Sequence, residues 1–456
     1  MLFANLLRRR CSSSLPLLLG TVVVLWFCSS HHVTATGSKV EYLPGVQPEG
    51  PLPFELETGY IGVGESEDIQ LFYYFVKSEL NPNIDPIVLW ISGGPGCSSF
   101  VAMTQELGPL LFDIPKDIWT TLPTLSLNPY SWTKVASFIF LDLPVRTGFS
   151  YVKSSKNYTV SDVETSYHAA EFIRKWLEDH FQYQSNSFYV GGDSNSGFTV
   201  PMAVQAISYG IDARLKPRVN LKGYVIGNGV TLPVDNYEYT YGTARGLCLI
   251  SEEQYTTVKD CIAINFSTPN CKNEGASMDV PQNIYWPNVI GEENDAKRFR
   301  GYNVHAFDRS VILLAALISS QWINDDKVLV ALHVRKGCGE KWTKCRVPLP
   351  YERTVLDTRP YHANLSAKGY RSLIYSGHAD LTVSSLYTEA WTKSLNYSII
   401  DDWRPWLVNN RVVGYTRIFS NNMTYAKILG SDHIAPTITP AECFKMFKRW
   451  ISYEQL

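Results

Sequence analysis

A turn of small residues around Ser194 is the part of the sequence best suited to nucleophilic chemistry. The run GGDSNSG at residues 191–197 lies between a strand-like segment, 188–190, and a helix-like segment, 199–207. Small residues on both sides of the serine permit the tight strand-to-helix turn that lifts a hydroxyl clear of a sheet. The alternative is a glycine-rich turn without chemistry, since Ser196 stands where such turns usually have glycine.

Two further segments have the residue types that such a serine needs. The run SGGPGC at residues 92–97 follows a buried strand, and glycine there lets backbone N–H groups approach a tetrahedral oxyanion. His433 is the last histidine of the chain and lies before the final predicted helix, where a general base follows the serine in chain order. The alternatives are a turn built only for sheet geometry and a surface histidine.

The elements that must position these residues alternate between strands and helices. Strands are expected at 71–76, 87–91, 138–141, 187–190 and 373–375, and helices at 167–181, 199–207 and 441–451. This alternation predicts an α/β fold, with a mostly parallel sheet covered on both faces.

The alternation stops over residues 231–350, which hold five cysteines. Helices are expected there at 310–318 and 326–333, so this segment is predicted to be a helical insertion stapled by disulfides. It separates a first core segment, 37–230, from a second, 351–456.

Residues 1–36 have the order of a secretory signal peptide. Three arginines at 8–10 precede an apolar run at 15–28, and small residues follow at 33–36. The apolar run is shorter than the roughly 20 residues that span a bilayer, although an uncleaved anchor is the alternative. We therefore expect a soluble mature protein in the secretory pathway, either extracellular or vacuolar.

Net charge and the spacing of cysteine and histidine limit the classes of binding partner that this chain is expected to have. With a net charge of −2 and no block of Lys or Arg, the 456-residue chain implies neither nucleic acid nor a membrane surface as a partner. Cysteine and histidine spacing suggests no metal site, and no cofactor is expected. Potential N-glycosylation sites lie at Asn157, Asn265, Asn364, Asn396 and Asn422.

Several ordered motifs resemble those of the serine carboxypeptidases. They are GGPGCSS at 93–99, DLPV at 142–145, GFSY at 148–151, GDS at 192–194, IYSG at 374–377, and His433 before Ala435-Pro436. The likeness runs from about Leu43 to Ile451 and is strongest to the plant serine carboxypeptidase-like proteins, which include glucose-ester-dependent acyltransferases. It implies an α/β-hydrolase core with a helical insertion that covers the active site.

The resemblance also implies residue roles. Ser194 would be the nucleophile and His433 its base, and the backbone N–H groups of Gly94 and Asn195 would form the oxyanion hole. Asn195 itself stands where the family usually has tyrosine, and Arg146 replaces a small residue in a neighbouring loop.

Ser92, Glu106 and Asp193 occupy the positions of a network that recognises the terminal carboxylate of a peptide. Two such acids close together would share a proton, which raises one pKa and favours activity at mildly acidic pH. The alternative for Glu106 is a solvated helix residue.

The resemblance further pairs Cys97 with Cys345 and Cys248 with Cys261. Cys443, on the inner face of the last predicted helix, is expected to be a buried thiol.

The main departure from the family lies in YSGHAD, residues 375–380. The family acid is expected directly after the glycine, where this chain has His378, and Asp380 matches a second, non-catalytic acid. Histidine supplies no negative charge, so impaired turnover is expected. The alternatives are that Asp380 replaces the acid after the turn rebuilds, or that an acid elsewhere completes the network.

The predicted function is acyl transfer through Ser194. Water as acceptor gives serine-type carboxypeptidase or esterase activity on a peptide C-terminus or a small acyl ester, and a metabolite hydroxyl gives transfer from a glucose ester. Asp193 before the serine, in place of glutamate, favours the acyltransferase branch. The alternative is a catalytically inactive pseudoenzyme that binds a ligand or protein partner in the former substrate pocket beside Ser194.

Overall fold

The computed structural model describes residues 37–114, 121–154, 158–232, 237–263, 309–336 and 341–456. These described residues belong to one compact unit. The predicted signal peptide, 1–36, lies outside the described residues, as do the glycosylation sites at Asn157 and Asn265.

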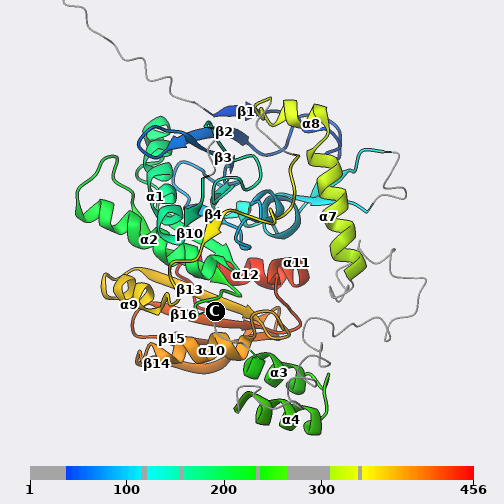
Figure 1. Cartoon of the computed structure of the whole chain (residues 1–456), viewed down its shortest axis with the longest axis vertical. Coiled ribbons are helices and arrows are strands. Elements are labelled where there is room, and N and C mark those ends of the chain that lie inside the picture. Colours follow the sequence, from blue (N-terminus) through cyan, green and yellow to red (C-terminus); the bar gives the residue numbers. More distant parts are fainter. Residues whose placement is uncertain (1–36, 115–120, 155–157, 233–236, 264–308, 337–340) are drawn as a thin grey trace, which may run out of the picture. The chain divides into compact units, whose positions relative to one another are not determined.

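A sheet of twelve strands forms the frame of this unit (Figure 1). In sheet order its strands are β1 (Ser38–Val40), β2 (Leu56–Val63), β3 (Ile69–Val76), β7 (Ser137–Leu141), β4 (Ile87–Ile91), β10 (Phe188–Asp193), β11 (Leu221–Gly227), β13 (Arg371–Gly377), β16 (Met423–Ile428), β15 (Arg411–Phe419) and β14 (Ile399–Val408), with β8 (Tyr151–Val152) beside β3. The run from β7 to β16 is parallel, and both margins are antiparallel. The predicted α/β class and the parallel centre of the sheet are therefore confirmed, and the sheet as a whole is mixed, because both of its margins are antiparallel.

The helices connect and cover these strands. They are α1 (Asp162–Asp179), α2 (Ser196–Asp212), α3 (Tyr237–Gly246), α4 (Glu252–Ala263), α7 (Arg309–Ile323), α8 (Asp326–Ala331), α9 (Arg359–Ala367), α10 (Ser385–Ser394), α11 (Ala435–Ile438) and α12 (Pro440–Ile451), with short turns η1 (Ala102–Glu106), η2 (Trp132–Lys134) and η3 (Phe181–Tyr183). Two small strand pairs complete the fold, β5 (Leu110–Phe112) with β6 (Leu125–Leu127) and β9 (Val160–Ser161) with β12 (Tyr351–Glu352).

Side-chain alternation assigns the helices to opposite faces of the sheet. On β4, Leu89 packs in the apolar cluster that contains Trp176 of α1, whereas its neighbour Trp90 packs in the cluster that contains Phe447 of α12. Successive side chains of a strand point to opposite faces, so both faces of β4 are covered. This double burial explains why its sequence, IVLWI, is continuously apolar.

The start of α1 shows how local sequence sets an element boundary. The hydroxyl of Ser161 accepts the N–H of Glu164 at 3.2 Å, and the Glu164 carboxylate accepts the N–H of Ser161 at 3.1 Å. This capping box satisfies two N–H groups that have no partner within the helix. It starts α1 five residues before the predicted helix, because the capping residues are polar and lie outside the apolar pattern.

The described part of residues 231–350 contains α3, α4, α7 and α8 between β11 and β12. Trp322 of α7 stacks on Phe100 with ring centroids 5.7 Å apart, which attaches this helix to the core. The division into core segments and insertion stays a prediction. Among the described residues, none of the helices combines the length and hydropathy that a membrane crossing requires.

The disulfide Cys97–Cys345 is confirmed, and Cys443 is a buried free thiol as expected. The predicted pairing of Cys248 with Cys261 is wrong, because Cys248 is an exposed free thiol. Cys248 lies in the turn between α3 and α4, whereas position 261 is nine residues along α4, about 13 Å beyond its first residue at helical rise. A disulfide joins Cα atoms less than about 7 Å apart.

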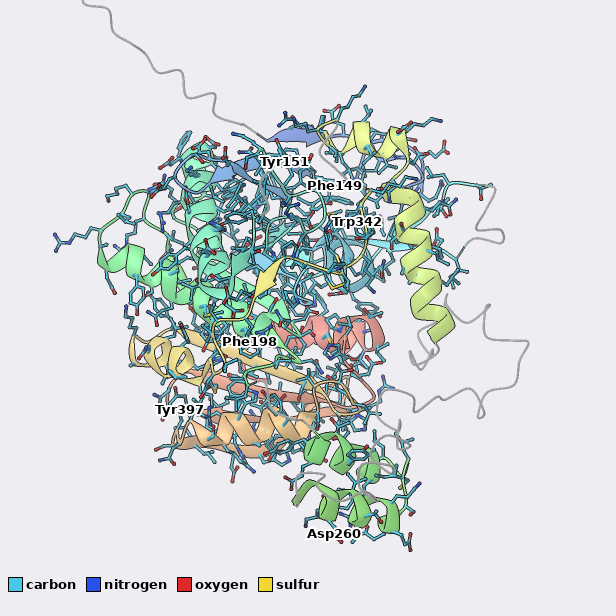
Figure 2. The ribbon with its side chains drawn as sticks, viewed as in Figure 1. Phe149, Tyr151, Phe198, Asp260, Trp342 and Tyr397 are labelled. Atoms are coloured by element: carbon cyan, nitrogen blue, oxygen red, sulfur yellow. A yellow bond between two sulfur atoms is a disulfide. The ribbon has the colours of Figure 1, made fainter. Side chains whose placement is uncertain are left out.

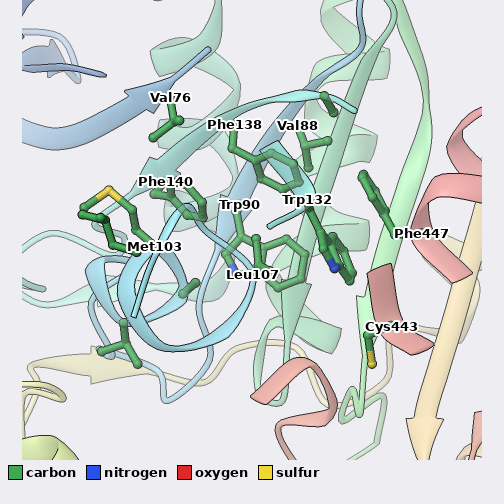
Figure 3. Packing of buried hydrophobic residues seen from close by; sticks show 14 of the residues in the cluster. Val76, Val88, Trp90, Met103, Leu107, Trp132, Phe138, Phe140, Cys443 and Phe447 are labelled. Atoms are coloured by element: carbon green, nitrogen blue, oxygen red, sulfur yellow. The ribbon is translucent and has the colours of Figure 1, made fainter. Parts of the chain in front are cut away.

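The contact between α12 and the turn η2 predicts a large effect of Phe447→Ala. Phe447 is fully buried and stacks on Trp132 with ring centroids 4.2 Å apart (Figure 3). Removing the ring leaves a cavity in the core, so the free energy of unfolding should fall by about 3–5 kcal/mol in chemical denaturation. Lys445→Ala, at an exposed position of the same helix, is the control and should change it by less than about 0.5 kcal/mol. Equal effects of the two changes would contradict this packing.

Candidate active site

Ser194 occupies the turn between β10 and α2 with the backbone conformation expected of an exposed nucleophile. Its φ is 53°, in the left-handed region that residues with side chains rarely adopt. The turn is tight because an added Cβ at Gly192 would lie 2.4 Å from the carbonyl oxygen of Ile91, and one at Gly197 would lie 2.4 Å from that of Val230. The small residues of GGDSNSG are therefore required by the close approach of neighbouring backbone.

Three side chains from distant parts of the chain form one hydrogen-bonded series. Nε2 of His433 lies 2.9 Å from Oγ of Ser194, and Nδ1 of His433 lies 2.8 Å from Oδ2 of Asp380. Because an ionised carboxylate only accepts, Nδ1 carries the proton, which leaves Nε2 of the neutral ring free to accept from the Ser194 hydroxyl. This is the tautomer that a general base requires.

Asp380 is fully buried and has several other donors. Its Oδ1 accepts the N–H groups of Thr382 at 2.7 Å and Val383 at 3.0 Å, and its Oδ2 accepts Nδ2 of Asn228 at 2.6 Å. A buried carboxylate needs such partners to stay ionised and oriented. The sequence does not mark Asn228 as a functional residue, because the one feature that could identify it is its position directly after the buried strand β11.

The structure corrects the expectation that His378 stands in the position of the triad acid. Nδ1 of His378 accepts the N–H of Gly430 at 3.0 Å, away from His433. The chain turns after Gly377, where an added Cβ would lie 2.2 Å from the carbonyl oxygen of Asp432. This turn brings Asp380, three positions beyond Gly377, to the imidazole of His433. The turn does not have to be rebuilt, and no acid from elsewhere in the chain is needed.

The loop at residues 92–97 lies against the serine turn. An added Cβ at Gly93 would lie 2.7 Å from Cβ of Ser194 and 3.1 Å from the backbone nitrogen of Asn195. Gly94 has φ 116°, a conformation that favours glycine. The two backbone segments expected to form an oxyanion hole are therefore adjacent.

Asp142 and the disulfide hold this loop in place. Oδ1 of Asp142 accepts the hydroxyl of Ser98 at 2.6 Å and the N–H of Ser99 at 3.1 Å, and Oδ2 accepts the N–H of Phe149 at 3.0 Å. Burial raises the pKa of Asp142 to about 7, although these three donors oppose the shift. The bond Cys97–Cys345 ties the other side of the loop to the end of the insertion segment.

Two acids, Glu106 and Asp193, are buried near Ser194, as is the hydroxyl residue Ser92. Burial raises the pKa of Glu106, and repulsion by Asp193 raises it further. Burial also raises the pKa of Asp193. The charge of His433 and the N–H of Gly93, which lies 3.2 Å from Oδ1, stabilise the Asp193 carboxylate and oppose this shift. The solvated alternative for Glu106 is therefore wrong, and the pair favours holding a proton near neutral pH.

The charges around His433 stabilise the imidazolium that forms when it takes a proton. Burial opposes the imidazolium, but the carboxylates of Asp380, Asp193 and Asp432 outweigh burial and raise the pKa of His433. An imidazolium that forms when Ser194 loses its proton would be stabilised by the same charges. The arrangement suits nucleophilic acyl transfer with general-base assistance.

Comparisons with known proteins agree with this geometry. The serine carboxypeptidase family model (Peptidase_S10) matches residues 44–453. Serine carboxypeptidase-like 11 of Arabidopsis thaliana is 44% identical over 450 residues, covering 97% of this chain and 100% of that protein. Serine carboxypeptidase-like 12 of the same plant is 44% identical over 443 residues, covering 95% and 98%.

The same architecture is found in a solved structure. Kex1(delta)p, a prohormone-processing carboxypeptidase from Saccharomyces cerevisiae, aligns with a TM-score of 0.70 at 19% identity, over 91% of this chain and 95% of that one. This similarity supports the predicted α/β-hydrolase fold. The chain belongs to the serine carboxypeptidase family.

Proposed function

We propose that this protein transfers acyl groups through a covalent intermediate on Ser194, with His433 as the general base and Asp380 as the triad acid. The observation that carries the proposal is the continuous series from Ser194 Oγ to His433 Nε2, 2.9 Å, and from His433 Nδ1 to Asp380 Oδ2, 2.8 Å. It joins nucleophile, base and acid in the order that this chemistry needs.

In the proposed reaction Ser194 Oγ attacks the substrate carbonyl while Nε2 of His433 takes its proton. The N–H groups of Gly94 and Asn195 stabilise the oxyanion, and Asp380 stabilises the imidazolium. His433 then returns the proton to the leaving group, which gives the acyl-enzyme. Attack by water or by an alcohol, again with His433 as base, releases the acyl group.

The acid pair supports substrates with a free C-terminal carboxylate, and hence a serine-type carboxypeptidase. A protonated Glu106 can donate to a carboxylate that an ionised Glu106 would repel. The hydroxyl of Ser92 is buried and has no hydrogen-bond partner among the described residues, so it is also available to such a ligand.

Acyl transfer from a glucose ester to a metabolite hydroxyl is the second candidate. It is favoured by Asp193, which stands directly before Ser194 in place of glutamate. The pseudoenzyme alternative loses its main support, since Asp380 and not His378 faces His433. Neither candidate requires a cofactor.

We further propose that the protein matures in the secretory pathway and acts in an extracellular or vacuolar compartment. The signal-like residues 1–36 and the disulfide Cys97–Cys345 support this location. Asn364, Asn396 and Asn422 are exposed and therefore accessible to glycosylation.

Covalent labelling tests the proposed nucleophile. We expect a fluorophosphonate probe to label the purified protein at Ser194, as located by peptide mass spectrometry, and Ser194→Ala to abolish the labelling. Product analysis with a blocked dipeptide and with a glucose ester plus an alcohol then separates hydrolysis from transfer. A folded wild-type protein that is never labelled would favour the pseudoenzyme.

Substitution at positions 380 and 378 separates the two candidate acids. Asp380→Asn should lower turnover of an ester by about 10⁴-fold, since the histidine loses the charge that orients and stabilises it. His378→Asp should change turnover by less than about 3-fold, because position 378 faces Gly430. A large gain from His378→Asp, or a small loss from Asp380→Asn, would show that the acid has been assigned to the wrong residue.

The raised pKa of Glu106 predicts a pH dependence of KM. The proton that binds a substrate carboxylate is present at low pH and is lost as pH rises through the raised pKa of the acid pair. KM for a blocked dipeptide should therefore increase with pH, whereas KM for an ester without a carboxylate should not. Glu106→Gln keeps a neutral donor and should flatten the dipeptide profile, and parallel profiles in wild type and variant would refute the role.

A further inference from the structure

Asn195, the residue after the nucleophile, is held by a side chain that follows β12, just beyond the predicted insertion segment. Nη2 of Arg353 donates a hydrogen bond to Oδ1 of Asn195. The guanidinium also lies over the ring of Phe198, 4.2 Å from the ring centroid. Phe198, labelled in Figure 2, lies on the first turn of α2. Arg353 therefore contacts the N-terminal end of α2 at two places.

Arg353 is anchored in turn by Asp162, the first residue of α1. Nη1 of Arg353 lies 3.7 Å from Oδ1 of Asp162, whose side chain is fully buried. Asp162 also accepts the hydroxyl of Tyr351 at 2.6 Å and the N–H of Thr354 at 2.6 Å. The strand pair β9 and β12 places these residues side by side. These donors fix the buried carboxylate, which attracts the guanidinium as an ion pair, since Nη1 of Arg353 makes no hydrogen bond among the described residues.

The chemistry of the two groups sets the orientation of the Asn195 side chain. A guanidinium has only donors, so it must face the carbonyl oxygen of the amide. Nδ2 of Asn195 is consequently turned away from Arg353, and it has no hydrogen-bond partner among the described residues. Arg353 is thus the hydrogen-bonding partner that fixes this side chain.

The position of Asn195 gives this contact its significance. Its backbone N–H is the proposed oxyanion donor, and it directly follows Ser194, whose left-handed φ of 53° is a strained conformation. Asparagine is a small side chain with little surface to pack, so its hydrogen bond to Arg353 helps to hold the turn.

We propose that Arg353 is a positioning residue for the oxyanion hole, acting through the series Asp162, Arg353 and Asn195. This inference rests on the proposed function of Ser194. Arg353 touches neither the nucleophile nor the base, and it acts by keeping the Asn195 N–H aimed at the developing oxyanion. Such a role affects the rate of acylation more than substrate binding.

The test is Arg353→Met, which keeps an unbranched apolar stem and removes the donors and the charge. We expect the second-order rate of Ser194 labelling by a fluorophosphonate, and kcat for an activated ester, to fall by about 10-fold or more, since loss of one oxyanion donor costs roughly 10²–10³-fold in rate. KM should change by less than about 2-fold. Arg353→Lys, which keeps a cationic donor, should recover part of the rate.

Tyr351→Phe is the matched control. It removes one donor to Asp162 but leaves the hydrogen bond between Arg353 and Asn195 in place, and the N–H groups of Thr354 and Val355 still hold Asp162, so we expect less than a 2-fold change in rate. The double variant Asn195→Ala with Arg353→Met should be no slower than Asn195→Ala, because both changes break the same contact. If Arg353→Met does not fold, the same comparison is made with Arg353→Lys.

The outcomes separate this inference from the proposed function. Labelling of wild type with an unchanged rate in Arg353→Met overturns the positioning role and leaves Ser194 as the nucleophile. An equal loss in Tyr351→Phe, or additive losses in the double variant, also overturns it, since the effect would then be structural. A folded wild-type protein without labelling overturns both.

Discussion

The burial of the Asp380 carboxylate is the constraint on which the candidate site depends. A carboxylate removed from water is costly unless donors surround it, and here Thr382, Val383, Asn228 and His433 provide them. Each donor comes from a loop at the same edge of the sheet. The satisfied charge therefore fixes the relative positions of these loops as well as the tautomer of His433.

The parallel sheet makes this convergence possible. Ser194 follows β10, Asn228 follows β11, Asp380 follows β13 and His433 follows β16, and these four strands are adjacent and parallel. Carboxyl ends of parallel strands lie at one edge, so residues separated by more than 200 positions in the chain meet there. The glycine loop after β4, the next strand in the sheet, adds the oxyanion segment.

Much of this arrangement could be read from the sequence, because its signals are local. The span of β4 was predicted residue for residue, since five apolar residues end at a Pro-Gly turn. α12 was predicted within one residue from its amphipathic pattern. The turn at Ser194 was also predicted, because small residues there reflect steric contacts with neighbouring backbone. By contrast, β14 and β15 of the antiparallel margin were missed, since half-exposed strands carry weaker patterns.

The sequence by itself determined the fold class, the serine, the histidine and one disulfide, since each is marked by residue types at short spacing or by an ordered set of family motifs. Only the tertiary structure decided which acid serves His433, because a turn of three residues chooses between side chains that are two positions apart. It likewise separated Cys248 from Cys261 and brought Arg353 to Asn195. Those outcomes depend on distances between elements, which a linear pattern does not contain.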